Sequence, residues 1–203
     1  MPYYQHLLII GAVAAVVWCL VIYYWPRMLL SVYKRAAFGK GFGDGPIPVN
    51  TLHTQPLALF AEPIAAQTAT DSNVLTVGVN HDTFLATGWL DLRQGPLILH
   101  VPDMNGPDSS RRYYSVQFTN SSNNTVFAYV GTRTTGTQTG DYLITGPGWK
   151  GSVPQGMGRI SAPNNSVIVV GRVLVYSDSD VATAYDLSKQ IQLTPLSQWK
   201  PRQ

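Results

Sequence analysis

The chain has 203 residues, 12% of them charged, and a formal net charge of +3. The four cations that precede Asp44 directly follow an apolar segment. From Asp44 onward, the body of the chain contains 10 Lys and Arg and 11 Asp and Glu. The body therefore lacks the basic stripe of a nucleic-acid-binding protein, which excludes nucleic acid as the expected partner. The single cysteine, Cys19, excludes an internal disulfide and a cysteine-ligated zinc site.

Residues 1–25 are predicted to form a single N-terminal transmembrane α-helix. The stretch from Leu7 to Trp25 contains no charged residue, and aromatic residues flank both of its ends. As a helix it spans about 28 Å, close to the ~30 Å hydrocarbon core of a bilayer. A buried core helix and a cleaved signal peptide are the alternatives. The signal peptide is disfavoured because no Lys or Arg precedes Leu7, the apolar run is long, and its end is bulky and aromatic.

Residues 26–49 are predicted to be a basic amphipathic juxtamembrane segment with a Gly/Pro hinge. RMLLSVYKRAAF is typical of a short helix lying at the membrane surface, and GKGFGDGPIP is typical of a flexible hinge. The cations expected to meet anionic lipid are Arg27, Lys34, Arg35 and Lys40. Since no basic residue precedes the apolar helix, the positive-inside rule places the C-terminal domain on the cytosolic side, the alternative being a periplasmic or other extracytoplasmic domain.

Residues 50–203 are predicted to form one β-rich domain, although LALFAEPIAAQ near its start has the pattern of a short helix broken at Pro63. Seven β-branched or aromatic runs then alternate with turn residues: VLTVGV, TFLATGWLDL, PLILHV, YYSVQF, TVFAYVGT, DYLITG and SVIVVGRVLVY. This pattern predicts a mainly β fold of the β-sandwich or jelly-roll type, since a βαβ fold needs helices of about ten or more residues between strands.

One short C-terminal helix is predicted within SDSDVATAYDLSKQI. Ser177 or Ser179 is the expected cap, and Val181, Tyr185 and Ile191 are expected to share the buried face. The tail LTPLSQWKPRQ is expected to pack along the domain.

Six motifs follow one another in the order found in a known family: VNHDTFLATGWLDLRQGPLILHVPD, RRYYSVQF, FAYVGTRTTG, DYLITGPGWKG, SAPNNSVIVVGRV and LTPLSQW. Through them, from about Asn50 to Trp199, the sequence resembles the domain of unknown function 1254 family. The resemblance implies a fold dominated by β-sheet, a context in bacterial exported proteins or large DNA viruses, and no assigned reaction. Many relatives carry a second domain, so a function that needs both domains is expected to require another chain.

The chain departs from the family pattern within these motifs. Val79 stands where relatives tend to have Pro, and Phe84 and Leu85 stand where they often have Tyr. Asn120 is the nearest match to an Asp that relatives commonly place after the Tyr pair. These departures reduce the support for an inherited active site.

Asp82, next to His81, is the best sequence candidate for catalysis or ligand binding. Asp and His can serve as acid and base or as metal ligands, but adjacent strand residues point to opposite faces, and the alternative is that Asp82 accepts hydrogen bonds at a turn. Arg112, Arg133 and Arg172 form the rest of the candidate polar cluster, either as clamps for a carboxylate or phosphate or as ties between loops. The expected structural partners of these arginines are Asp82, Asp91 and Asp141.

The leading hypothesis is a membrane-anchored, non-enzymatic structural or interaction protein. Its narrower form is a minor capsid protein, or one that links the internal membrane of a large DNA virus to its capsid. The expected partners are the lipid bilayer and proteins of a larger assembly. No cofactor or metal is expected, because His53, His81 and His100 would have to be brought together by folding. The alternative is an envelope-anchored bacterial hydrolase or small-ligand-binding protein with a pocket around Asp82.

Three glycosylation sequons bear on topology. They begin at Asn120, Asn123 and Asn164. A lumenal domain in a eukaryotic cell could be modified there, whereas a cytosolic one could not.

Overall fold

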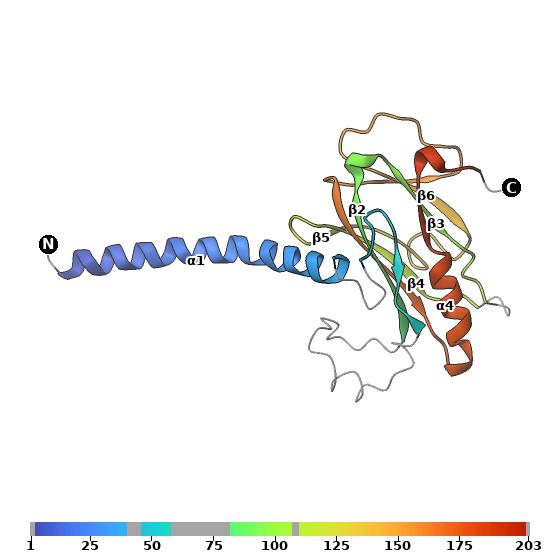
Figure 1. Ribbon diagram of the computed structural model, residues 1–203, viewed down its shortest axis with the longest axis horizontal. Coiled ribbons are helices and arrows are strands. Elements are labelled where there is room, and N and C mark those ends of the chain that lie inside the picture. Colours follow the sequence, from blue (N-terminus) through green and yellow to red (C-terminus); the bar gives the residue numbers. More distant parts are fainter. Residues whose placement is uncertain (1–2, 40–45, 58–81, 107–109, 202–203) are drawn as a thin grey trace.

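The N-terminal apolar segment forms one long helix. The computed structural model describes residues 3–39, 46–57, 82–106 and 110–201. Helix α1 (Tyr3–Tyr33) leads directly into the π-helical turn η1 (Lys34–Phe38) and projects from a body rich in β-strands (Figure 1). It is long and apolar enough to cross a membrane, and its most apolar stretch is not buried in the protein. A signal sequence near an N-terminus meets the same criterion of length and apolar composition.

Helix α1 does not end at Trp25. Pro26 lies inside α1, and the residues after it remain helical through η1. The prediction of a separate helix along the membrane surface was therefore wrong in its boundary. The physical reason is that the sequence from Arg27 to Phe38 is rich in good helix formers and has no glycine, so that the helical conformation persists until Gly39. The predicted hinge lies largely outside the described residues.

Among the described residues, the strands form two open sheets, with every pairing antiparallel except β6 with β7. The first sheet has the order β1 (His53–Thr54), β2 (Thr83–Asp91), β8 (Ser166–Leu174), β4 (Tyr114–Asn120) and β5 (Thr125–Gly131). The second has the order β7 (Gly158–Ser161), β6 (Gly140–Thr145), β3 (Leu97–Val101) and β9 (Gln192–Pro195). The short 3-10 turn η2 (Leu92–Gln94) leads from β2 towards β3 in the other sheet. The mainly β fold is confirmed.

The alternation of side chains along the strands accounts for the core. In β8, Val167, Val169 and Val173 are buried in the main hydrophobic cluster, whereas Ile168 joins a smaller cluster on the other face of the sheet. This follows from the two-residue period of a strand. Leu99 of β3 lies in the main cluster as well, so side chains of both sheets share one core.

Six of the seven predicted strand runs correspond to strands, and VLTVGV lies outside the described residues. The sequence patterns missed β1, β7 and β9, which have only two to four residues each. The tail was expected only to pack along the domain, but its LTP segment pairs with β3 as part of β9. Such short strands carry too few residues for a period to be recognised.

The predicted C-terminal helix is present as α4 (Val181–Gln190), preceded by the 3-10 turn η3 (Asp178–Asp180). Ser177, one of the two predicted caps, occupies the N-cap position of η3, and Asp180 occupies that of α4, but neither side chain makes a capping hydrogen bond. Ser177 and Ser179 instead contact each other through their hydroxyl groups at 2.9 Å. The expected apolar face is confirmed, since Tyr185 packs against the core and its ring lies 5.3 Å from that of Phe84.

Candidate functional site

The end of the helical segment is packed onto the outer face of the five-stranded sheet. We call the residues that make this contact the junction cluster: Phe38, Ile47, Trp89 and Ile168, all buried. The rings of Phe38 and Trp89 meet edge to face at 5.8 Å, and the Lys34 ammonium lies 4.5 Å from the centre of the Trp89 ring. The cluster forms because Trp89 and Ile168 are outward-facing neighbours in register on β2 and β8. It attaches the apolar helix directly to the domain.

Beside the junction cluster lies an open hollow with a volume of about 260 Å³, which we call the junction site. The helical segment contributes Lys34, the end of β2 contributes Trp89 and Asp91, and η2 contributes Arg93. The turn before β5 contributes Ser122, the turn before β8 contributes Asn164 and Asn165, and β8 itself contributes Ser166. The sequence reasoning singled out Lys34 as a membrane-surface residue, but it did not place it in a site with residues from β2 and these turns.

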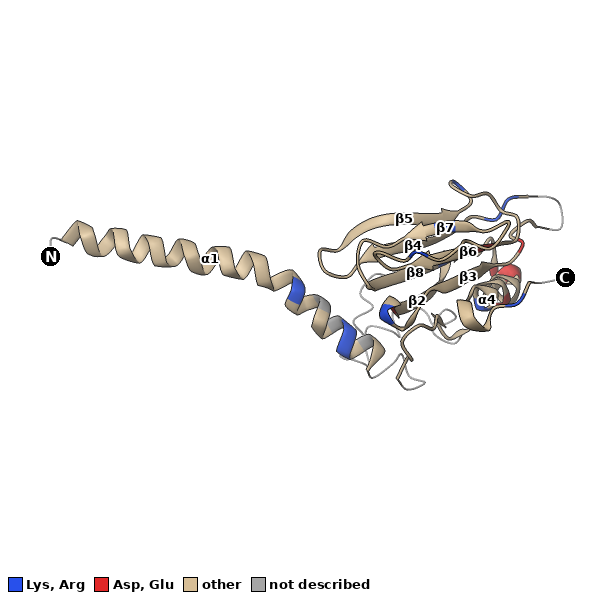
Figure 2. Cartoon of the chain, turned by 90° about the horizontal axis from the view of Figure 1, so that it is seen from above, with Lys and Arg blue, Asp and Glu red and all other residues tan. Residues whose placement is uncertain are grey.

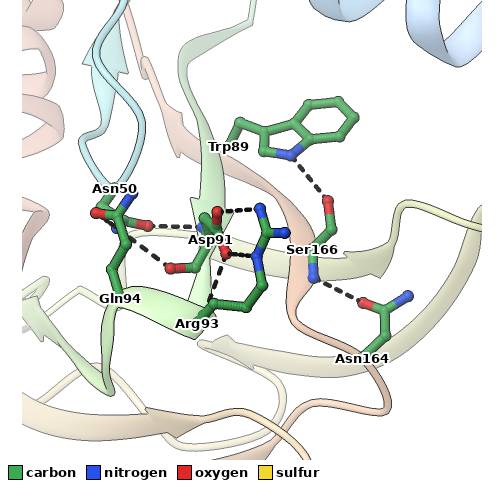
Figure 3. A network of polar contacts seen from close by, with 7 residues as sticks. All are labelled: Asn50, Trp89, Asp91, Arg93, Gln94, Asn164 and Ser166. Carbon is green, nitrogen blue, oxygen red and sulfur yellow. Dashed lines mark hydrogen bonds and ion pairs between the residues drawn. The ribbon is translucent and has the colours of Figure 1, made fainter.

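Hydrogen bonds hold the Trp89 side of the junction site in place (Figure 3). The Trp89 indole donates to the Ser166 hydroxyl at 2.9 Å, and the Ser166 backbone N–H donates to the Asn164 side-chain oxygen at 3.0 Å. Asn164 in turn donates to the hydroxyl of Ser122 at 3.0 Å and to the side-chain oxygen of Asn120. The ring face that receives the Lys34 ammonium is therefore fixed by a chain of contacts that ends in the β4–β5 turn.

A second set of contacts orders the acidic side of the site (Figure 3). Arg93 binds Asp91 through two side-chain N–H groups, at 2.8 and 2.5 Å. This contact holds the pKa of Asp91 below its usual range, and the charge of Lys34 acts in the same direction. The Asp91 backbone N–H donates to Asn50 at 2.7 Å, and Asn50 also donates to Gln94 at 3.0 Å. Asn50 has a positive φ of 67°, a conformation that Asn tolerates better than most residues.

The predicted membrane-surface cations are partly gathered at this end of the helix. In Figure 2 the basic residues of the helical segment, drawn in blue, lie in the part of the helix nearer the domain. The N-terminal part of the helix shows no blue. Arg27 folds back on its own helix and donates to the Tyr23 carbonyl at 2.6 Å. Lys34 and Arg35 are exposed on η1, and Lys40 lies outside the described residues.

The predicted polar cluster around Asp82 is not assembled in the described structure. Asp82 is exposed in the bend immediately before β2, and its backbone carbonyl accepts from the Val175 N–H at 2.8 Å. His81 lies outside the described residues. Arg133 is exposed and stacks over Tyr113, with 5.5 Å from guanidinium to ring centre. Arg172 lies on β8, in register with Leu85 on one side and Ser115 on the other.

Arg112 has a different partner from those expected. Its buried guanidinium binds both carboxylate oxygens of Asp180, at 2.6 and 2.7 Å, and donates to the Leu174 carbonyl at 2.6 Å. The contact raises the pKa of Arg112 and, aided by the Tyr176 backbone N–H, holds that of Asp180 below its usual range. The expected pairing with Asp82, Asp91 or Asp141 was wrong. The pair instead ties the segment just before β4 to the N-cap position of α4.

A histidine that the sequence left unassigned takes part in another contact. On the outer face of the four-stranded sheet, His100 Nδ1 lies 2.7 Å from Asp141, its neighbour in register on β6. The other Asp141 oxygen accepts from the indole of Trp199 at 3.2 Å. The contact thus ties the C-terminal segment to the sheet. No group of three or more His, Cys, Asp or Glu among the described residues could hold a metal ion.

The fold and these contacts describe a β-rich domain with an apolar helix attached to its sheet. The model of the family described as Protein of unknown function (DUF1254) matches residues 62–195, more than half of the chain. The protein therefore belongs to this family, and the resemblance inferred from the six motifs is confirmed.

Among solved structures, the chain is similar to the crystal structure of the VPA0106 protein from Vibrio parahaemolyticus. The TM-score is 0.63 at 24% sequence identity, and the similarity covers 90% of this chain and 39% of that one. At this identity the similarity concerns the fold alone. No curated protein matches the sequence.

Proposed function

We propose that this protein is a membrane-anchored, non-enzymatic structural or interaction protein that holds its β domain close to a bilayer. The observation that carries the proposal is the junction cluster, in which Phe38 at the end of the helical segment packs on Trp89 of the sheet, and the Lys34 ammonium lies over the same Trp89 ring. A retained anchor that is packed against its domain sets the position of that domain relative to the membrane. A signal sequence has no comparable need for a specific contact with the mature domain.

We infer further that the two sheets form a sandwich of the jelly-roll kind, with the C-terminal domain on the cytosolic side. The shared hydrophobic cluster supports the sandwich, and the basic residues after the apolar helix support the orientation. The narrower role is that of a minor capsid protein, or of a protein that links the internal membrane of a large DNA virus to its capsid. This role is supported by the occurrence of the resembling family in large DNA viruses. It is also supported by the absence of cysteine from the domain, which suits the reducing cytosol.

Retention of the helix can be tested on the full chain in its native membranes. Mass spectrometry is expected to detect peptides from the segment before Trp25, and the protein is expected to stay in the membrane pellet at alkaline pH. Placing Val16→Arg and Val17→Arg together at the centre of the helix should release it, since each arginine there costs about 2.5–3.5 kcal/mol of insertion. The control Tyr129→Arg adds a charge to an exposed position of the domain and should leave the protein in the pellet. A mature chain that begins after Trp25 would overturn the proposal.

The orientation can be tested with the natural sequon at Asn123, which is exposed in the turn between β4 and β5. During translation into microsomes, Asn123 should remain unmodified, whereas a sequon added before the helix should be glycosylated. Modification at Asn123 would place the domain in the lumen and contradict the cytosolic orientation.

The alternative, an envelope-anchored hydrolase or small-ligand-binding protein around Asp82, has less support. Asp82 is exposed, and Arg112, which was to join it, is bound to Asp180. Hydrolytic activity of the full chain that is lost in Asp82→Asn would favour this alternative.

A further inference from the structure

The length of the helix relates the junction site to the depth of a membrane. Helix α1 has 31 residues, which correspond to about 46 Å at 1.5 Å per residue. A bilayer measures about 30 Å across its hydrocarbon core and about 40–45 Å with its headgroup regions. A helix of this length is long enough to extend through both headgroup regions. If α1 spans the bilayer with Tyr3 at the opposite surface, Lys34, which directly follows α1, lies at the outer edge of the headgroup region, and the junction site lies there with it.

The charge of the junction site suits a singly charged anion. Its lining contains two cations, Lys34 and Arg93, and one carboxylate, Asp91. Asp91 is paired with Arg93 at 2.5 Å, which leaves a net charge of about +1 at the site. A phosphodiester carries one negative charge, as in the headgroup linkage of a phospholipid.

The hydrogen-bond donors of the site remain available to such an anion. Arg93 is largely exposed and directs two of its five side-chain N–H groups to Asp91, which leaves three for another acceptor. The Lys34 ammonium lies over the Trp89 ring, a contact that positions its charge without using an N–H donor on an oxygen. The Ser122 hydroxyl accepts from Asn164 and retains its own O–H as a donor.

The hollow is also large enough. Its volume of about 260 Å³ corresponds to about nine water molecules at ~30 Å³ each, enough for a phosphate group and several waters. The side facing Lys34 is held in place by the contacts of Trp89 with Ser166 and Phe38. The ligand therefore meets donors that are already positioned, which lowers the entropic cost of binding.

We propose that the junction site binds the phosphodiester group of a membrane lipid headgroup between Lys34 and Arg93. This proposal rests on the membrane anchor proposed above, because the anchor brings the site to headgroup level. Binding of this kind would fix the rotation of the domain about the helix and its height above the bilayer. The ligand class is an anionic phosphodiester, and the bilayer is its source.

The test uses the full chain, purified in a phosphate-free neutral detergent and titrated with dihexanoyl-phosphatidylglycerol below its micelle concentration. Native mass spectrometry counts the lipid bound to each protein molecule. The variants are Lys34→Gln and Arg93→Gln, and the matched control is Arg35→Gln, which removes the same charge one residue further along η1 but does not line the site. Binding should weaken about tenfold or more in each site variant, the effect of losing one charge-assisted hydrogen bond, and less than about twofold in the control.

Equal weakening of lipid binding in all three variants would show a general attraction of the lipid to a basic surface and would overturn the proposed site. Inorganic phosphate that displaces the lipid, with the same dependence on Lys34 and Arg93, would assign the site to free phosphate and overturn the lipid source. Thermal unfolding of each variant within about 2 °C of the parent confirms that the fold is intact, as expected for exposed side chains. The membrane-anchor proposal is refuted by release from the membrane at alkaline pH or by the absence of peptides from the N-terminal segment. The lipid-site proposal is refuted by the pattern of binding among the three variants, so the two failures are distinguishable.

Discussion

Replacing Asp180 with Asn tests whether the buried Arg112–Asp180 pair stabilises the domain. Asn has nearly the same shape and is an equally good N-cap residue, so Asp180→Asn removes the charge and little else. The variant leaves the guanidinium of Arg112, 3% exposed, without its counter-ion and places an amide against its N–H donors. The expected result is a domain of markedly lower stability.

The magnitude follows from the burial of both partners. Breaking a fully buried pair from one side costs about 3–5 kcal/mol, because the remaining charge is left uncompensated. The side chain of Asp180 is 16% exposed, and water can reach part of the site, so we expect about 2–4 kcal/mol. For a chain of this size, this loss corresponds to a decrease of about 4–16 °C in the unfolding temperature.

The dependence on pH separates this pair from ordinary surface charge. Arg112 holds the pKa of Asp180 below its usual range. Asp180 in the folded state thus binds its proton less readily than in the unfolded state, where its pKa is about 3.9. The stabilisation is complete above that value and is lost as the pH falls through the lower pKa of the folded state. The difference in stability between parent and variant should therefore be full at pH 6 and shrink below about pH 4.

The assay is thermal unfolding of the full chain in detergent, followed by near-ultraviolet circular dichroism from pH 3 to pH 7. Asp178→Asn is the matched control, because Asp178 lies in the same turn and is exposed, and it should change stability by less than about 0.5 kcal/mol. The reasoning is refuted if Asp180→Asn unfolds within about 1 °C of the parent at pH 7. It is also refuted if the difference between the two proteins is the same at pH 3 and pH 7.

Three further substitutions probe contacts elsewhere in the molecule. Phe38→Ala removes the ring packed on Trp89 and should speed tryptic cleavage after Lys34 and Arg35 in detergent, whereas an unchanged cleavage rate would show that the junction cluster does not hold the helix. Gly88→Ala should lower the free energy of unfolding in denaturant by about 1–3 kcal/mol, because the added Cβ would lie 2.5 Å from the Thr51 carbonyl oxygen; a neutral result would mean that the chain at Thr51 moves aside freely. Trp199→Phe removes the indole donor to Asp141 and should cost about 0.5–1.5 kcal/mol in the same assay, and a stability equal to the parent's would assign no energetic weight to that bond.

The fold class could be predicted because it depends on local patterns. The alternation in β2 and β8 places hydrophobic side chains on both faces of one sheet, and the pattern is long enough to be recognised in each strand. The short strands β1, β7 and β9 escaped prediction, because each forms only where a neighbouring strand offers hydrogen bonds.

The candidate site was harder to predict, because its residues come from distant parts of the sequence. Lys34 lies over Trp89 and lines one hollow with Arg93 only when β2 and β8 are paired and the helical segment is packed on their outer face. Nothing in the local sequence of Arg93 distinguishes it from a surface arginine. Arg112 was recognised as a candidate, but its partner Asp180 lies 68 positions away and no pattern connects the two.

The sequence by itself determined the apolar helix, the β-rich class of the domain and its family, since each of these depends on hydrophobicity, on a short period or on motifs in order. Only the tertiary structure decided that the helical segment packs on Trp89, that Arg112 binds Asp180, and that Lys34 and Arg93 face one hollow. The physical reason is that ion pairs and aromatic contacts depend on distances of a few ångströms between side chains. Those distances are set by which strands pair and in which register, and the residues themselves carry no local signal of them.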